Sequence, residues 1–555
     1  MELWWLYQKS PAKIGFSMKK ESLQKVIKLD KELLDLLIKR TLLYSTYLRD
    51  KRKKNTPISD SEFEGRLWKI WSKKTKDVGI NPKTLRTLYN HFNNLSYELA
   101  EKEEEKSFKL RPLKNKPVNI NLAGPFDVYL TRFLIYISAL KNLPLEIKHL
   151  VLNDAIYQLI KAFNALDSSF TWDRDLLLKK EGRPINFNKK VIFTGEDELN
   201  LYLLIFAAIS QPGICKFTGD SNLKSMDLRP LFSLVSQMGA RIAPLIPGSY
   251  GLPIRIEATG TINDTLVISE EVPDPAFWAF LISTIAYNLN KISISTPNRD
   301  LSNPFIDRIF FLFNKLGIKY QIENDHITLI PGLNYSMEIP HILDPELTAY
   351  LLGIVIICGG EADITGTYPV DFNDGAQFLK IFKPITPNII VEKNRISIKY
   401  EKKKLDFLEL DIQGSSRLLP LAVSLGIFAN KAKIRGIPLS EQDNLNYVLT
   451  SLNINYELNK DTLLIYKTRE KKDKKQVKIF SPTPNWSIAL SLISLIGYEI
   501  VLENPGEITK LWPTYWTYFK SIPKITNITQ KKEEDQVELK KTRRRFLISG
   551  DKKVR

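Results

Sequence analysis

Cysteine, histidine and long apolar runs are all scarce in this sequence. Two cysteines, Cys215 and Cys358, among 555 residues are too few for a disulfide framework or a cysteine-based zinc site. The four histidines are scattered, and we expect no metal site. The longest apolar runs, 276–287 and 347–358, fall short of the roughly 20 residues of a membrane span, so we expect buried helices there. No charged-then-apolar leader opens the chain, which favours a cytoplasmic protein with no membrane segment.

Motifs that bind nucleotides or cofactors are also missing. The sequence has no Gly-x-x-x-x-Gly-Lys-Ser/Thr loop, no dinucleotide fingerprint and no Gly-x-Ser-x-Gly elbow. We therefore expect a protein that works without a cofactor.

The positive charge lies at the two ends of the chain. Of the formal net charge of +18, residues 1–116 carry +12 and residues 524–555 carry +6. Residues 117–523 balance 42 basic against 42 acidic side chains. We expect the basic tail, 526–555, to be disordered, and a solvated tail is favoured over a nucleic-acid-binding one.

The amino-terminal part has the pattern of a helical domain. Residues 18–53 place leucine, isoleucine and valine on one helix face and charged residues on the other. Two shorter helices are predicted over 61–76 and 82–106, after breaks at 57–60 and 79–82. The sequence therefore predicts an all-α domain over 18–106, followed by a basic linker over 107–116.

Residues 117–525 alternate β-rich and helical segments in a repeated order. The clearest example is an amphipathic helix over 303–317 that ends at a glycine, followed by a strand, a tight turn and a second strand up to 330. Similar segments recur about every 70 residues, a period longer than that of solenoid repeats. Six copies predict an α/β fold of two lobes, each with three units of the βαββαβ type.

Two local motifs resemble the family of 5-enolpyruvylshikimate-3-phosphate (EPSP) synthases, which are enolpyruvyl transferases. Phe217-Thr-Gly-Asp220 leads to an Arg229-Pro230 pair and a Gly239-Ala240 turn, and a late Lys510-Leu-Trp-Pro513 matches the closing signature. The resemblance implies one lobe over 125–334 and a second lobe over 117–124 and 335–525. It also implies two anionic substrates, phosphoenolpyruvate and shikimate 3-phosphate, bound between lobes that close.

The resemblance implies site residues, and four of them are kept. Arg132, Arg229 and Lys510 fall where the family binds anions, and Glu441 falls at the glutamate of a catalytic Lys-Glu-x-Asp-Arg motif. Cations at these positions would neutralise phosphate and carboxylate groups, and a carboxylate would move a proton.

Most of the other site positions are substituted. Asp127 or Phe126 replaces a lysine that touches both substrates, and the phosphoenolpyruvate loop reads Gly195-Glu-Asp-Glu198, whose carboxylates would repel an anion. The remaining replacements are Pro273-Asp-Pro275 for Ser-Ser-Gln, Ser416 for the catalytic aspartate, Ser440 and Asn444 for the Lys and Arg of the motif, and Pro484-Asn-Trp486 for Asp-His-Arg. Loss of these groups together predicts impaired catalysis.

The helical domain is similar to the all-helical chorismate mutases. The run Leu29–Arg40, with its Asp-x-x-Leu-Leu-x-Leu-Leu-x-x-Arg spacing, is followed by matching residues downstream. The resemblance implies remnants of a dicarboxylate site at Arg40, Lys51, Asp60 and Ser96. It also implies a homodimer formed through residues 18–53.

Three functions remain open from the sequence. The first is a catalytically impaired fusion of these two families that acts as a scaffold or regulator of aromatic amino acid biosynthesis. The second is a diverged but active transferase that uses Arg132, Arg229, Glu441 and Lys510 on phosphoenolpyruvate, shikimate 3-phosphate or another small anion. The third and weaker function is nucleic-acid binding through the basic ends.

Overall fold

The computed structural model describes residues 13–53, 61–75, 81–101, 107–110 and 117–522, the last range without 288, 302, 324, 331–337, 404 and 467–475. The chain divides into two compact units, Met1–Lys106 and Ser107–Arg555. We call the described part of the first the helical head and that of the second the two-lobed unit. The expected disordered tail, 526–555, and residues 111–116 of the expected linker lie outside the described residues.

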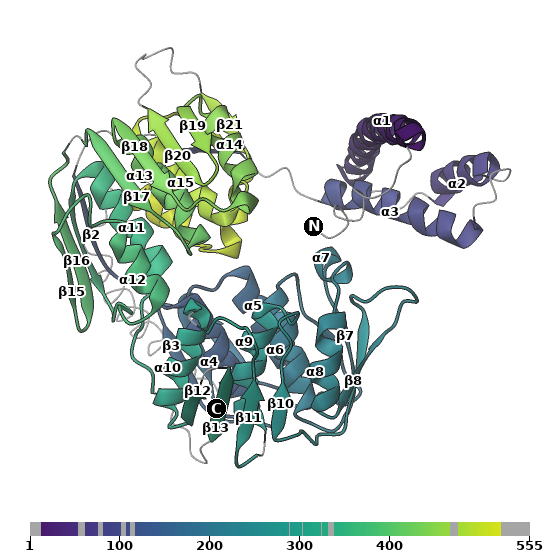
Figure 1. The fold of residues 1–555 in the computed structure, drawn as a ribbon, viewed down its shortest axis with the longest axis horizontal. Coiled ribbons are helices and arrows are strands. Elements are labelled where there is room, and N and C mark those ends of the chain that lie inside the picture. The colour runs from purple at the N-terminus through teal and green to yellow at the C-terminus, as the bar shows by residue number, and fades with distance from the viewer. Residues whose placement is uncertain are drawn as a thin grey trace, which may run out of the picture. The chain divides into compact units, whose positions relative to one another are not determined.

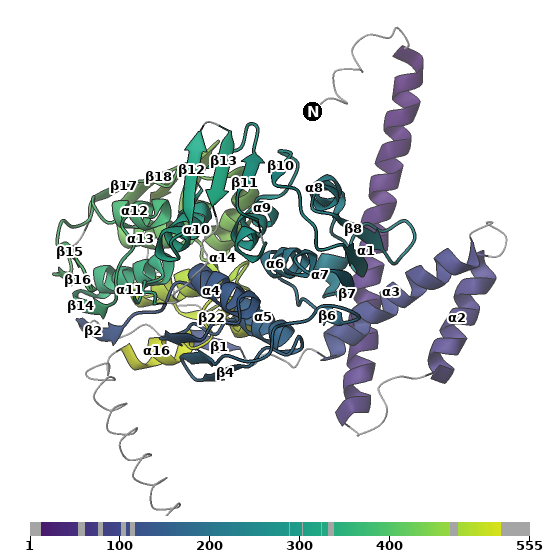
Figure 2. The same ribbon diagram turned by 90° about the horizontal axis from the view of Figure 1, so that it is seen from below.

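The helical head contains three described helices near the predicted ranges: α1 (Lys13–Lys53), α2 (Ser61–Thr75) and α3 (Pro82–Glu101). Tyr44 and Leu48 of α1 are buried, and Phe63 of α2 packs beside them. The amino-terminal part of α1 extends beyond α2 and α3, as Figure 2 shows. Among the described side chains of α1, those with a core within the head lie in its carboxy-terminal part.

The first lobe contains three sheets built from consecutive segments. Its elements are α4 (Val128–Leu140), β3 (Leu145–Lys148), α5 (Asp154–Asn164), β4 (Phe170–Asp173), β5 (Leu176–Lys179), β6 (Val191–Phe193), α6 (Glu198–Ile209), β7 (Gly213–Thr218), α7 (Ser221–Lys224), η4 (Arg229–Leu231), α8 (Phe232–Gln237), β8 (Ala240–Pro244), β9 (Ile254–Ala258), β10 (Thr265–Val267), α9 (Asp274–Ser283), η5 (Thr284–Ala286), β11 (Ile292–Ser295), α10 (Pro304–Lys315), β12 (Lys319–Glu323) and β13 (His326–Ile330).

The second lobe also contains three sheets. Its elements are β1 (Phe108–Leu110), β2 (Val118–Ala123), α11 (Pro345–Cys358), β14 (Gly360–Thr365), α12 (Asn373–Lys380), β15 (Ile389–Glu392), β16 (Arg395–Tyr400), β17 (Phe407–Asp411), η6 (Ser416–Leu418), α13 (Leu419–Phe428), β18 (Lys431–Arg435), η7 (Leu439–Glu441), α14 (Gln442–Ser451), β19 (Asn455–Asn459), β20 (Thr462–Tyr466), β21 (Val477–Ile479), α15 (Pro484–Ile496), β22 (Ile500–Leu502), η8 (Pro505–Lys510) and α16 (Tyr515–Ser521).

The order of elements within a unit differs from the predicted βαββαβ order. In β10–β13, for example, two parallel strands are each followed by a helix, and an antiparallel hairpin comes last, which is βαβαββ. The strands lie in the order β10-β11-β13-β12, and β17–β20 repeat this arrangement. In the structure the second helix, α10, comes before the hairpin β12–β13, whereas the predicted order placed two adjacent strands before the second helix. The expected linker also differs, because its first residues form β1, which pairs with β22.

Two crossing segments connect the lobes (Figure 1). Strand β2 pairs in parallel with β14 of the second lobe, and the chain then enters the first lobe through residues 124–127. It returns before α11, where Leu343 forms a bridge with Phe126 and His341 Nε2 lies 2.9 Å from the carbonyl oxygen of Gly124. Gly360, which begins β14, has φ +119°, and a Cβ there would lie 1.9 Å from the carbonyl oxygen of Val118. The parallel pairing of β2 therefore requires a glycine at this position.

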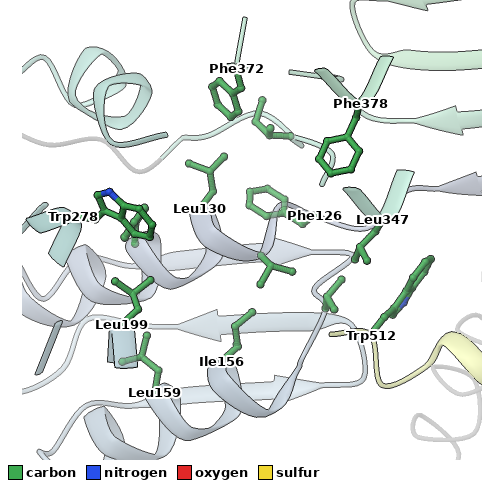
Figure 3. Packing of buried hydrophobic residues seen from close by; sticks show 14 of the residues in the cluster. Phe126, Leu130, Ile156, Leu159, Leu199, Trp278, Leu347, Phe372, Phe378 and Trp512 are labelled. Carbon is green, nitrogen blue, oxygen red and sulfur yellow. The ribbon is translucent and has the colours of Figure 1, made fainter. Parts of the chain in front are cut away.

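A single hydrophobic cluster runs through both lobes. The apolar runs at 276–287 and 347–358 lie largely in α9 and α11, which are buried on all sides, so the predicted buried helices are confirmed. Figure 3 shows part of this cluster, with Leu130 and Trp278 from the first lobe and Phe372 and Phe378 from the second. None of the helices in the described part of the chain is long and apolar enough to cross a membrane.

Candidate functional site

The ends of several helices from both lobes meet beside the first crossing segment. Asp127 lies there as the N-cap of α4, and its Oδ1 accepts a hydrogen bond of 2.8 Å from the backbone N–H of Leu130. The side chain is completely buried. A buried carboxylate requires a positive partner, and a helix N-terminus supplies only part of one.

Arg308 of α10 supplies that partner. Its Nε and Nη2 donate to both carboxylate oxygens of Asp127 at 2.7–3.0 Å, and its Nη1 donates to Asp374 Oδ1 at 3.2 Å and to the carbonyl oxygen of Pro304 at 2.9 Å. The Arg308 side chain is completely buried as well. Burial would lower its pKa, but Asp127 and Asp374 outweigh burial and raise it. Arg308 therefore stays charged.

A second arginine, Arg417, continues the network into the second lobe. It donates through Nε and Nη2 to Glu346 of α11, and its Nη1 lies 3.6 Å from Asp374 Oδ2. Glu346 also accepts a hydrogen bond from Asn485 at the start of α15. We call Asp127, Arg308, Glu346, Asp374 and Arg417 the inter-lobe charge cluster.

Asp344 lies next to this cluster, at the N-cap of α11. Its Oδ1 accepts a hydrogen bond from Leu347 N–H at 3.0 Å, and its Oδ2 accepts one from Val128 N–H at 3.2 Å. Burial raises the pKa of Asp344 to about 7, with the neighbouring charges of Asp127 and Glu346 adding to the effect. The cluster has three carboxylates for two guanidinium groups, so a further negative charge at Asp344 is disfavoured.

Aromatic rings fill the space around the two arginines. Tyr129 and Phe305 lie 4.3 Å apart between centroids, and Phe305 lies 4.1 Å from Trp278. The Arg417 guanidinium lies 5.6 Å from the rings of both Tyr129 and Phe305. Cation–π contact and a low local dielectric both favour these charges remaining paired with one another.

Two predicted anion-binding residues are paired with carboxylates of the segment Gly195–Glu198. Arg132 is buried, and its Nη1 lies 2.9 Å from Oδ1 of Asp197, the N-cap of α6. Lys510 Nζ lies 3.6 Å from Glu196 Oε1 and 3.3 Å from Glu507 Oε1. Burial lowers the pKa of Lys510, but Glu507 and Glu196 outweigh it, so the net shift is upward. The acids Glu196 and Asp197, at the position predicted for the phosphoenolpyruvate loop, are thus partners of two of the predicted anion-binding cations.

The other two predicted residues lie apart from this network. Arg229 is exposed on η4, where it makes two-pronged contacts with Asp227 and stacks over Tyr250 at 4.6 Å. Glu441 is half-buried at the end of η7, and its Oε2 accepts a hydrogen bond of 3.2 Å from Asn444. The described contacts do not bring Arg229, Glu441 and Lys510 together.

Substituted positions have mainly structural roles. Asp274 opens α9 and pairs with Arg299 at 2.7 Å, and Trp486 is fully buried in α15. Ser416 opens η6, one residue before Arg417. These positions now serve the core and the helix ends.

Among the predicted remnants in the helical head, Arg40 is the one whose described contacts link α1 to α3. Arg40 donates to the carbonyl oxygen of Phe92 at 3.1 Å and to Asn93 Oδ1 at 2.5 Å, and Ser96 Oγ donates to the same carbonyl at 3.4 Å. Lys51 Nζ lies 5.5 Å from the ring of Tyr47. Asp60 lies outside the described residues.

Sequence reasoning missed Arg308, Arg417, Glu346, Asp374 and Asp344. One signal was available for Arg308, which interrupts the apolar stripe of the predicted helix over 303–317 that holds Phe305, Ile309 and Leu312. An arginine on a buried helix face requires an acidic partner. Its partners are distant in sequence, so the pattern alone does not identify them. In the described residues no cluster of histidine, cysteine and carboxylate side chains could hold a metal ion.

Comparison with known proteins gives one consistent result. A model of the family "EPSP synthase (3-phosphoshikimate 1-carboxyvinyltransferase)" matches residues 114–519. Curated relatives named 3-phosphoshikimate 1-carboxyvinyltransferase include those of Buchnera aphidicola subsp. Cinara cedri, 23% identical, and Aliivibrio fischeri, 21% identical. The alignments cover 76% and 75% of this chain, respectively, and 99% of each relative.

Two solved structures share the fold. The EPSP synthase from Acinetobacter baumannii has a TM-score of 0.59 at 15% identity, over 75% of this chain and 98% of that one. The enolpyruvyl transferase NikO from Streptomyces tendae has a TM-score of 0.57 at 11% identity, over 75% and 97%.

Replacing Arg308 tests the inter-lobe charge cluster. Arg308→Met should lower the free energy of unfolding of the two-lobed unit by about 3–5 kcal/mol, because it leaves Asp127 and Asp374 buried without their cation. Urea denaturation measures this. Arg395→Met, which removes an arginine from exposed pairs with Glu392 and Asp363, should have a far smaller effect. Equal losses in the two variants would contradict the assignment.

The raised pKa of Asp344 predicts a specific pH dependence. Between its ordinary value of 3.8 and about 7, the folded chain holds a proton on Asp344 that the unfolded chain has released. The contribution of this group to stability is therefore complete below pH 3.8 and is lost as pH rises through 7. Urea midpoints at several pH values should show wild type losing stability relative to Asp344→Asn over this range. If the urea midpoints of wild type and Asp344→Asn change with pH in parallel, the raised pKa of Asp344 is contradicted.

Proposed function

The chain belongs to the EPSP synthase (3-phosphoshikimate 1-carboxyvinyltransferase) family, and we propose that it has lost enolpyruvyl transfer. We propose a scaffold or regulatory role in aromatic amino acid biosynthesis. The observation that supports this is the pairing of the cations between the lobes with the chain's own carboxylates.

Enolpyruvyl transfer between anionic substrates requires unpaired positive charge. In this chain Arg132 is paired with Asp197, Lys510 is paired with Glu507 and Glu196, and the lysine position holds Asp127 or Phe126. A substrate phosphate that reached Arg132 would have to displace a carboxylate 2.9 Å away. It would also meet the negative charge of that carboxylate, which opposes binding. Preorganised positive charge, the largest contribution to catalysis of this kind, is therefore reduced at Arg132 and Lys510.

The helical head supports a role in assembly. Tyr44 and Leu48, which are buried against the other helices, share a face of α1 with Val26, Leu29 and Leu33, and these three are 52%, 62% and 58% exposed. Apolar residues on a continuous helix stripe favour burial against a partner. We propose that residues 18–53 form a homodimer interface in which this stripe meets its counterpart, and that the head descends from a chorismate mutase.

A diverged but active transferase is the alternative, and Arg229 favours it. Its side chain is 59% exposed, and its pairing with Asp227 is a surface pair of the kind that contributes little. A small anion could therefore compete for Arg229 with Asp227. Under this alternative Arg132, Glu441 and Lys510 would complete a site for a different anionic substrate.

Titration and turnover assays test the loss of transfer. We expect no phosphate release from shikimate 3-phosphate with phosphoenolpyruvate, and no calorimetric heat with these compounds or with chorismate. The EPSP synthase of Acinetobacter baumannii serves as the active control. A double variant, Glu196→Gln with Asp197→Asn, should gain measurable phosphate binding, because it frees Arg132 from its carboxylate partner and removes one of the two carboxylates beside Lys510, while asparagine still caps α6. Phosphate release by the wild-type chain would contradict the proposal.

Analytical ultracentrifugation tests the homodimer. The wild-type chain should sediment as a dimer, and Leu29→Lys with Leu33→Lys should sediment as a monomer, because charges then interrupt the apolar stripe. Asp35→Lys on the polar side of α1 changes the net charge by the same amount and should remain dimeric. A monomeric wild type, or equal dissociation of both variants, would contradict the interface.

A further inference from the structure

The side chain of Arg308 joins segments that belong to different lobes. It projects from α10 of the first lobe, pairs with Asp127 of the crossing segment at 2.7 Å, and pairs with Asp374 of α12 in the second lobe at 3.0 Å. All three side chains are buried. Each of the three guanidinium nitrogens makes at least one hydrogen bond. Arg308 therefore has no free face toward a ligand.

Contacts on both sides of this pair also cross between the lobes. Asp307 Oδ2 accepts a hydrogen bond of 2.8 Å from the backbone N–H of Asn373. Phe372 lies with its ring 5.1 Å from the Arg308 guanidinium and makes an edge contact with Phe311 at 5.7 Å. A charged centre and an apolar surface thus connect α10 to the start of α12.

Arg417 makes a second connection in the opposite direction. It belongs to the second lobe, where Glu346 holds it, and its guanidinium lies over the rings of Tyr129 and Phe305 of the first lobe. Separating the lobes would expose these rings and would remove Arg308 from Asp374. Such a separation breaks the ion pair between Arg308 and Asp374 and exchanges the apolar surroundings of both arginines for water.

We propose that the inter-lobe charge cluster is a latch that holds the two lobes closed without any ligand. Arg308 and Arg417 bring the lobes together because Asp127, Asp374 and Glu346 provide the negative charge. An anion is not required for closure, and it cannot reach Arg308 unless the latch first opens. This inference goes beyond the proposed function, since it concerns closure and not chemistry.

Pulsed electron spin resonance measures closure directly. Nitroxides are placed at Lys224→Cys in the first lobe and Lys478→Cys in the second, both exposed, with Cys215 and Cys358 replaced by alanine. The full-length chain should give one narrow distance distribution. The distribution should not change when shikimate 3-phosphate and phosphoenolpyruvate are added together. A broad distribution without ligand, or a shorter distance with ligand, would overturn the latch.

Two variants open the latch at different points. Asp374→Asn weakens the link to the second lobe while Arg308 keeps Asp127, and Arg308→Gln removes the central cation. Both should lengthen and broaden the distribution, whereas Arg395→Gln, an exposed arginine, should leave it unchanged. If Arg308→Gln does not fold, Asp374→Asn carries the test. Wild-type distances in Asp374→Asn would overturn the proposal.

The same samples separate this inference from the proposed function. Phosphate release at an unchanged inter-lobe distance would contradict the proposed loss of enolpyruvyl transfer but would agree with the proposed latch. A distance that shortens with ligand, without phosphate release, would contradict the latch and leave the loss of transfer standing.

Discussion

The buried guanidinium of Arg308 is the interaction on which the two-lobed unit depends. A charge with no exposed surface is tolerated only when its partners are fixed in position, and those partners come from the crossing segment and from α12. The requirement therefore sets the approach of α10 to α12 and the position of the α4 N-terminus. The aromatic rings of Tyr129 and Phe305 then complete a water-poor setting that strengthens each pair.

Asp127 explains why this closure and the family's chemistry exclude each other. The resemblance to EPSP synthases implies a lysine at Asp127 or at Phe126. A lysine in place of Asp127 would put two cations together in a buried space beside Arg308. With aspartate there, the α4 N-terminus is capped and Arg308 is neutralised by one side chain. Under the proposed function, a single reversal of charge removes a substrate-binding cation and at the same time neutralises Arg308.

Much of the fold could be predicted from the sequence, because it depends on local patterns. The helices of the head and the buried helices α9 and α11 follow from apolar periodicity and run length. The order within a unit could not be predicted, because strands as short as β10, which spans Thr265–Val267, contain too few residues to show a period. The partners of Arg308 were also beyond reach, since Asp127 and Asp374 are 181 and 66 residues away in sequence. Family motifs identified the positions at which this sequence differs from the family. They carry no information about the contacts that the substituting residues make.

The two units differ in whether their charged and apolar side chains find partners within the same unit. Between the lobes, the retained cations Arg132 and Lys510 have acidic partners within the same unit, so the region has little capacity left for an external anion. In the head, Leu29, Leu33 and Leu36 remain 58–65% exposed on a helix that has no core of its own over that stretch. Exposed apolar surface favours association, whereas neutralised charge does not. The exposed apolar stripe of α1 is therefore the surface on which the proposed association depends, and the inter-lobe charge cluster is the internal support of the two-lobed unit.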